Sequence, residues 1–179
     1  ANFLEQIRRR CGGLELSDDP AVLESHGRDW TRFREPNASA VAFPRSVEQV
    51  AELVRAAGKM GVGLVPSGGR TGLSGGAVAA AGEVVVAMDR MRKIGAFDPV
   101  DRLLAVEPGV TTGAIQERAR ELGLFYPISF AAEGSAQIGG NIATNAGGIR
   151  VLRHGTTRER VAGLKVVDGL GRVLDLNRG

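Results

Sequence analysis

The sequence predicts an α/β protein, in the α+β arrangement, with a small parallel-sheet lobe and a larger mixed-sheet lobe. A strand–helix–strand pattern precedes residue 88, and pairs of strands separated by tight turns follow residue 89. Gly is the third indication, because 26 of the 179 residues are Gly and many of them cluster in two loops. We expect a partly helical lead-in at residues 1–36, lobe one at 37–88 and lobe two at 89–179.

The first lobe is expected to begin with strand, helix and strand, the first two strands forming a parallel pair. Short apolar runs predict three strands, at residues 39–43, 64–66 and 83–88. Ser46 followed by Gln49 has the spacing of a capping box, so a helix should begin there. Gly61 should end that helix.

The second lobe is expected to consist mainly of hairpins and one helix. Its strands are predicted at residues 94–97, 103–107, 161–167 and 172–176. Thr111 or Thr112 should cap a helix that Gly123 ends. Residues 125–157 show no period, and no helix or strand is predicted there.

The first glycine loop, residues 66–77, directly follows a predicted strand. Five glycines in nine positions allow successive backbone N–H groups to converge on a phosphate or pyrophosphate. The loop matches neither a Walker A motif nor a Rossmann fingerprint, and residues 77–82 are too few for a crossover helix. A nest of N–H groups would therefore hold the anion, with hydroxyls and Arg70 adding to it. A flexible connector is the structural alternative. The candidate residues are Pro66, Ser67, Gly68, Gly69, Arg70, Thr71, Gly72, Leu73, Ser74, Gly75 and Gly76.

Gly72 is the position at which we expect a positive φ, so Gly72→Val should abolish ligand retention.

The second glycine loop, residues 137–148, is composed mostly of small and amide-bearing residues. Its backbone could approach a flat ligand while Asn141 and Asn145 form hydrogen bonds with it. A turn that packs against a strand is the alternative. Two such loops in one chain favour a ligand site.

Composition excludes several other classes of protein. No apolar run reaches the roughly 20 residues of a membrane span, and the N-terminus lacks the apolar stretch of a signal peptide, so we expect a cytoplasmic protein. Cys11 is alone and only His26 and His154 offer imidazole, so a self-contained zinc site is not expected. The net charge of +3 comes without a basic stripe interleaved with aromatics, so nucleic acid is not an expected partner.

Four ordered motifs resemble one known family. They are Pro-Ser-Gly-Gly-x-Thr-Gly-x-x-Gly-Gly at 66–76, Glu-Pro-Gly-Val at 107–110, Ile-Gly-Gly-Asn-Ile-Ala-Thr-Asn-Ala-Gly-Gly at 138–148 and Gly-Thr-Thr at 155–157. Together they resemble the FAD-binding domain of the vanillyl-alcohol oxidase and p-cresol methylhydroxylase (PCMH) superfamily, over residues 36–176. The most similar branch is the FAD-linked D-2-hydroxy acid dehydrogenases, which include D-2-hydroxyglutarate dehydrogenase, D-lactate dehydrogenase and the glycolate oxidase catalytic subunit.

The resemblance implies a PCMH-type FAD-binding fold and a role for each motif. The first loop would cradle the FAD pyrophosphate, and Arg70 stands where relatives with loop-linked flavin have His, which implies non-covalent FAD. Near the adenosine half would lie Pro108, Gly109 and Val110, with Val161 and Gly163 on the adenine side. Beside the isoalloxazine and ribityl chain would lie Ile138, Gly139, Gly140, Asn141, Thr144, Asn145 and Gly148.

The function that the resemblance implies is hydride transfer from C2 of a small D-2-hydroxy acid to flavin N5. Catalytic residues and any metal ligands would lie in a substrate domain that follows residue 179, so the fragment is expected to be inactive alone. The electron acceptor is not identified. Two alternatives stay open: an NADPH-dependent flavin reductase of the murein-precursor type, and a nucleotide-binding module without redox chemistry.

Overall fold

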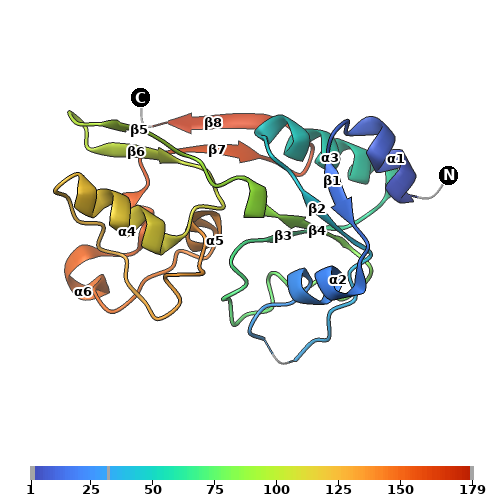
Figure 1. Cartoon of the computed structure of the whole chain (residues 1–179), viewed down its shortest axis with the longest axis horizontal. Coiled ribbons are helices and arrows are strands. Elements are labelled where there is room, and N and C mark those ends of the chain that lie inside the picture. Colours follow the sequence, from blue (N-terminus) through green and yellow to red (C-terminus); the bar gives the residue numbers. More distant parts are fainter. Residues whose placement is uncertain (1–2, 32, 178–179) are drawn as a thin grey trace.

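The computed structural model (Figure 1) describes residues 3–31 and 33–177. The predicted α/β class is confirmed. The first lobe has a four-stranded sheet in the order β1-β2-β4-β3, in which β2, β4 and β3 run parallel and β1 is antiparallel. Its strands are β1 (Glu15–Ser17), β2 (Ala40–Phe43), β3 (Leu64–Ser67) and β4 (Val84–Ala87).

The strand order corrects the predicted pairing. The first two predicted strands are parallel but not neighbours, because β4 lies between them, with Val85 opposite both Val41 and Val65. All four residues are buried in each of the two inner strands, β2 and β4, and β4 has the continuous apolar sequence of a strand covered on both faces. The N-terminal segment also contributes β1, which the sequence analysis did not predict.

Three helices belong to the first lobe: α1 (Phe3–Arg10), α2 (Pro20–His26) and α3 (Val47–Met60). On one face of the sheet, Leu53 of α3 and Ile7 of α1 are fully buried against Val84. The α3 helix begins as expected, since the Ser46 hydroxyl accepts a hydrogen bond from the Gln49 N–H at 3.3 Å. It ends at Gly61, whose φ of 66° is left-handed.

The second lobe contains two separate antiparallel hairpins among the described residues. They pair β5 (Ile94–Asp98) with β6 (Leu103–Val106), and β7 (Gly163–Val167) with β8 (Val173–Asn177). The only mixed sheet of the described chain is thus in the first lobe. Tight turns can join only antiparallel strands, whereas the long connections of the first lobe permit parallel pairing.

The remaining helices all follow β4 in the chain, and one of them, α5, lies within the second glycine loop. They are η1 (Met88–Arg90), α4 (Thr112–Glu121), α5 (Ile138–Ala143), α6 (Val151–His154) and η2 (Thr157–Arg160). Thr111 caps α4, as predicted. The short helices α5 and α6 lie in the stretch where none was predicted, because Gly139 and Gly140 are poor helix formers and tertiary contacts override that preference.

The C-terminal hairpin connects the two lobes (Figure 1). Its turn lies on α3, where the Arg55 guanidinium donates to the Gly171 carbonyl at 2.6 Å. A Cβ at Gly171 would lie 2.7 Å from the Ala51 carbonyl oxygen, so the turn approaches the helix backbone closely. No helix of the described chain is long and apolar enough to cross a membrane.

Candidate functional site

The first glycine loop leaves the carboxyl end of β3 and is held there by side chains from α2 and η1. The buried Ser67 hydroxyl donates to the His26 carbonyl at 3.3 Å. Arg70 has a φ of 59° and Gly75 a φ of 75°, so these two residues make the left-handed bends. Gly72 is not in the left-handed region, which corrects the expectation for that residue.

The first glycine loop packs at Gly69 against the backbone that directly precedes the second glycine loop. A Cβ there would overlap the Ser135 carbonyl oxygen and lie 2.8 Å from the Ala136 Cα. Real Cβ atoms do not approach backbone this closely, so glycine is required by packing and not by φ. Gln137, where the predicted flavin loop begins, lies beside Gly68 of the predicted pyrophosphate loop.

The turn at Pro108–Val110 contacts the first residues of α5. The N–H groups of Ile138 and Gly139 donate to the carbonyls of Val110 and Pro108, at 2.8 and 2.9 Å. A Cβ on Gly139 would lie 2.8 Å from the Pro108 Cβ. These motif residues therefore fix one backbone segment to another, and those two N–H groups already have partners.

The two asparagines of the second loop also form hydrogen bonds within the protein. The buried Asn141 donates from Nδ2 to the Thr112 hydroxyl at 2.6 Å, and Asn145 Oδ1 accepts from the Arg158 N–H at 3.0 Å. Thr144 donates to the Gly140 carbonyl at 2.9 Å. These side chains hold the shape of the loop, whereas the sequence analysis expected the two amides to contact the ligand.

Of the other predicted site residues, some lie beside open space and others pack against the protein. Nothing lies within 4 Å of a Cβ built on Gly76 or Gly140, so a ligand can approach both. Gly148, with a φ of 130°, packs its backbone on that of Ser129. Gly163 pairs with Asn177 at the start of β7.

Arg70 belongs to a charged cluster beneath the first loop. Its guanidinium lies 3.2 Å from Asp89 Oδ2 and donates to the Gly68 carbonyl at 3.1 Å. Arg92 binds the other Asp89 oxygen at 3.0 Å, and the His26 Nε2 is 4.0 Å from Oδ2. Burial, and after it the Arg70 charge, lowers the pKa of His26. Arg70 is thus held within the protein by a carboxylate that it shares with Arg92.

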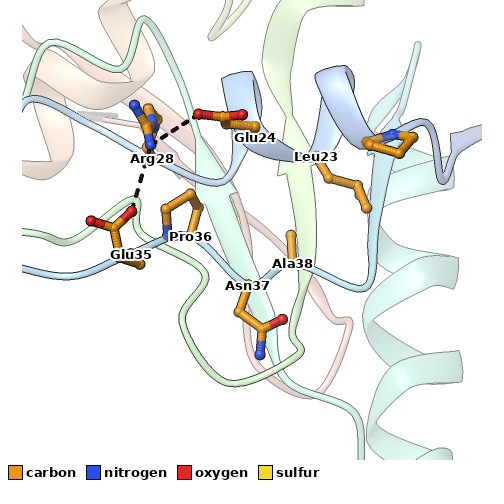
Figure 2. Close-up of a pocket in the computed structure, with 8 residues that line it drawn as sticks. Leu23, Glu24, Arg28, Glu35, Pro36, Asn37 and Ala38 are labelled. Atoms are coloured by element: carbon orange, nitrogen blue, oxygen red, sulfur yellow. Dashed lines mark ion pairs between the residues drawn. The ribbon is translucent and has the colours of Figure 1, made fainter.

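A cleft of about 840 Å³ opens beside the contact between the loops. Residues from three segments face it: Asp29, Trp30 and Thr31, then Gly69, Arg70, Thr71 and Leu73, then Ala131, Ala132 and Ser135. A smaller hollow of about 400 Å³ lies away from both loops (Figure 2). There Arg28 forms ion pairs with Glu24 and Glu35, and no glycine-loop residue takes part.

Two buried side-chain atoms lack a hydrogen-bond partner in the described chain, and both lie beside the first loop. They are the Gln137 Oε1, 3.5 Å from a Cβ built on Gly68, and the Thr31 hydroxyl, 3.8 Å from one built on Gly75. Buried polar atoms normally have partners. Open glycines and unpartnered polar atoms along one loop fit a ligand that carries both phosphates and hydroxyls, as FAD does.

Comparison with known proteins decides the family. Residues 38–177 match the family described as FAD binding domain. The chain belongs to this FAD-binding domain family. The predicted cofactor, FAD, is thereby confirmed.

The similar proteins carry related names. The chain is 59% identical over 171 residues to D-2-hydroxyglutarate dehydrogenase of Xanthomonas citri pv. viticola, covering 96% of the chain and 36% of that protein. It is 54% identical over 176 residues to the protein of the same name from Stutzerimonas stutzeri, covering 98% and 38%. A solved alkyldihydroxyacetonephosphate synthase has a TM-score of 0.86 at 19% identity, covering 99% of the chain and 35% of that structure.

These similarities confirm the predicted resemblance and favour it over the reductase and the non-redox module. The similarity to the synthase shows the shared fold. The chain spans a little more than a third of the length of the curated relatives it matches.

Proposed function

We propose that this FAD-binding domain serves a flavin-dependent dehydrogenase of D-2-hydroxy acids, with D-2-hydroxyglutarate as the preferred substrate. The packing of Gly69 against Ser135 carries the proposal, because it would hold the first loop beside the start of the second, where one dinucleotide could contact both. The curated relatives named for that substrate support the choice of acid.

The binding roles proposed for the residues follow from their contacts. N–H groups of loop 66–77 would hold the pyrophosphate, with Gly76 open to its approach. Gly140 leaves space for the flavin half at the second loop. Asp89 holds Arg70 within the first loop, so Arg70 shapes the loop and forms no covalent bond with the flavin.

A network of hydrogen bonds around Glu133 holds the segment that precedes the second glycine loop. Glu133 accepts from the Gln116 amide at 3.0 Å and from the Ser129 hydroxyl at 3.1 Å. These hydrogen bonds lower the pKa of Glu133, and the one from Gln116 has the larger effect. Glu133 therefore stays ionised at neutral pH. Gln116 also donates to the Ile128 carbonyl at 2.8 Å. These hydrogen bonds connect α4 to the segment that contains Ser135, which packs against Gly69.

The chemistry is divided between cofactor and protein. When bound, FAD accepts the hydride that leaves C2 of the hydroxy acid. The residues of this chain bind and orient the cofactor, and we assign none of them a catalytic or metal-binding role. The isolated chain should therefore show no turnover.

A dye-coupled assay of the intact protein tests this function. We expect turnover with D-2-hydroxyglutarate, slower turnover with D-lactate or glycolate, and none with L-2-hydroxyglutarate. Flavin-dependent oxidation of NADPH without any turnover of hydroxy acids would instead support the reductase. A protein purified without flavin and unable to bind it would contradict the whole assignment. Cell fractionation would test the proposed cytoplasmic location.

A further inference from the structure

Gln137 occupies the boundary between the two glycine loops. It directly precedes α5, and its backbone forms an isolated bridge with Thr111. The residue is 3% exposed, and its amide end faces Gly68 of the first loop. No motif in the sequence assigned it a role.

The amide oxygen of Gln137 has no hydrogen-bond donor. A buried amide oxygen without a donor is unfavourable, since it has given up its hydrogen bonds to water. Neighbouring amides show how the fold treats such groups: Asn141 donates to Thr112, and Gln116 donates to two acceptors. Gln137 differs from these amides because its missing partner would have to come from outside the described chain.

We propose that Gln137 Oε1 accepts a hydrogen bond from a hydroxyl of the ribityl chain of FAD. This inference rests on the proposed placement of FAD. In FAD the ribityl chain joins the pyrophosphate to the flavin ring, so it must pass between a pyrophosphate loop and a flavin loop. Gln137 lies at that boundary, with its Oε1 3.5 Å from the place that a Cβ on Gly68 would occupy. Phosphate oxygens carry no hydrogen to donate, whereas ribityl hydroxyls do.

The variant Gln137→Met, made in the intact protein, separates ligand binding from structural support. It keeps the length of the side chain and removes the amide. We expect the Kd for FAD to rise about 5- to 10-fold, the size of one lost hydrogen bond. ADP keeps the pyrophosphate but has no ribityl chain, so its Kd should not change.

The melting temperature of the flavin-free protein gives a second, independent readout. With Gln137→Met it should stay the same or rise, because the variant removes an unpartnered buried group. Gln116→Met is the matched control, since that amide is partnered within the protein, and it should lower the melting temperature.

The outcomes are distinct. A lower melting temperature of flavin-free Gln137→Met with unchanged FAD affinity would make Gln137 a structural residue and overturn the proposal. An equal loss of FAD and ADP affinity would also overturn it, because the variant would then act through the shape of the pyrophosphate loop. Failure of the unaltered protein to bind FAD would contradict the proposed function itself, which the wild-type titration shows separately.

Discussion

Gly69 and Ser135 pack so closely that any side chain on residue 69 would overlap the Ser135 carbonyl oxygen. The two residues are far apart in sequence, Gly69 in the first glycine loop and Ser135 two residues before the second. Glycine at 69 serves the contact between the loops. A substitution there should therefore affect folding and cofactor binding together.

We predict that Gly69→Ala lowers the stability of the intact protein by about 2 kcal/mol or more and leaves it without flavin. Gly12→Ala is the matched control, because it lies outside both glycine loops, nothing lies within 4 Å of its added Cβ and its φ is not left-handed. Thermal unfolding and the flavin-to-protein absorbance ratio measure the two effects. A flavin-replete Gly69→Ala protein with unchanged melting would show that the loops can separate without cost.

The second prediction concerns how the flavin is attached, and it follows from Arg70. Its side chain is engaged by Asp89 and is no nucleophile, so FAD should be bound without a covalent bond. After acid precipitation of the intact protein, the yellow colour should appear entirely in the supernatant. Flavin fluorescence that stays with the denatured protein band would contradict this prediction.

His26 predicts a loss of stability in mild acid. Its side chain is largely buried, and that burial, with the Arg70 charge, lowers its pKa. In the unfolded chain the pKa of His is about 6.5. Below that pH the unfolded state takes up a proton that the folded state resists, so stability falls as pH drops through the lowered folded pKa.

The test compares melting temperatures at about pH 7.5 and pH 5.5. His26→Gln should lose less stability on acidification than the unaltered protein. Equal acid sensitivity in His26→Gln and the unaltered protein would mean that other groups account for the loss.

Trp30 is expected to report on the cofactor. It is the chain's single Trp and lines the cleft beside the first glycine loop. Flavin absorbs where Trp emits, so FAD binding should quench its fluorescence. When the intact protein is titrated with FAD, the decrease in Trp fluorescence should be smaller for Trp30→Phe than for the unaltered protein. If that variant shows the full fluorescence change, FAD lies elsewhere.

Local chemistry made much of the fold predictable. The Ser46 cap, the glycine that ends α3 and the tight turn of each hairpin depend on neighbours within a few residues, and they were predicted within a residue or two. The motifs identified FAD only through their resemblance to a known family, because the loop chemistry by itself indicated no more than an anion and a flat group.

The misses share a physical cause. The strand β1 is only three residues long and exists because β2 offers it an edge. The helix α5 forms over Gly139 and Gly140 against local preference, because Val110 and Pro108 accept its first N–H groups. Gly72 was expected from its residue type to have a positive φ, whereas the fold gives its backbone another conformation.

The sequence by itself determined the α/β class, the main helix and the hairpins. These depend on periodicity and on short-range backbone chemistry. Tertiary structure alone decided that β4 is central, that Arg70 is held by Asp89, and that Gly69 rather than Gly72 is sterically required. It also decided that Gln137 is left without a partner. Each of these depends on contacts between residues far apart in the chain, and the spacing of residue types along a sequence does not encode which distant backbone will lie against them.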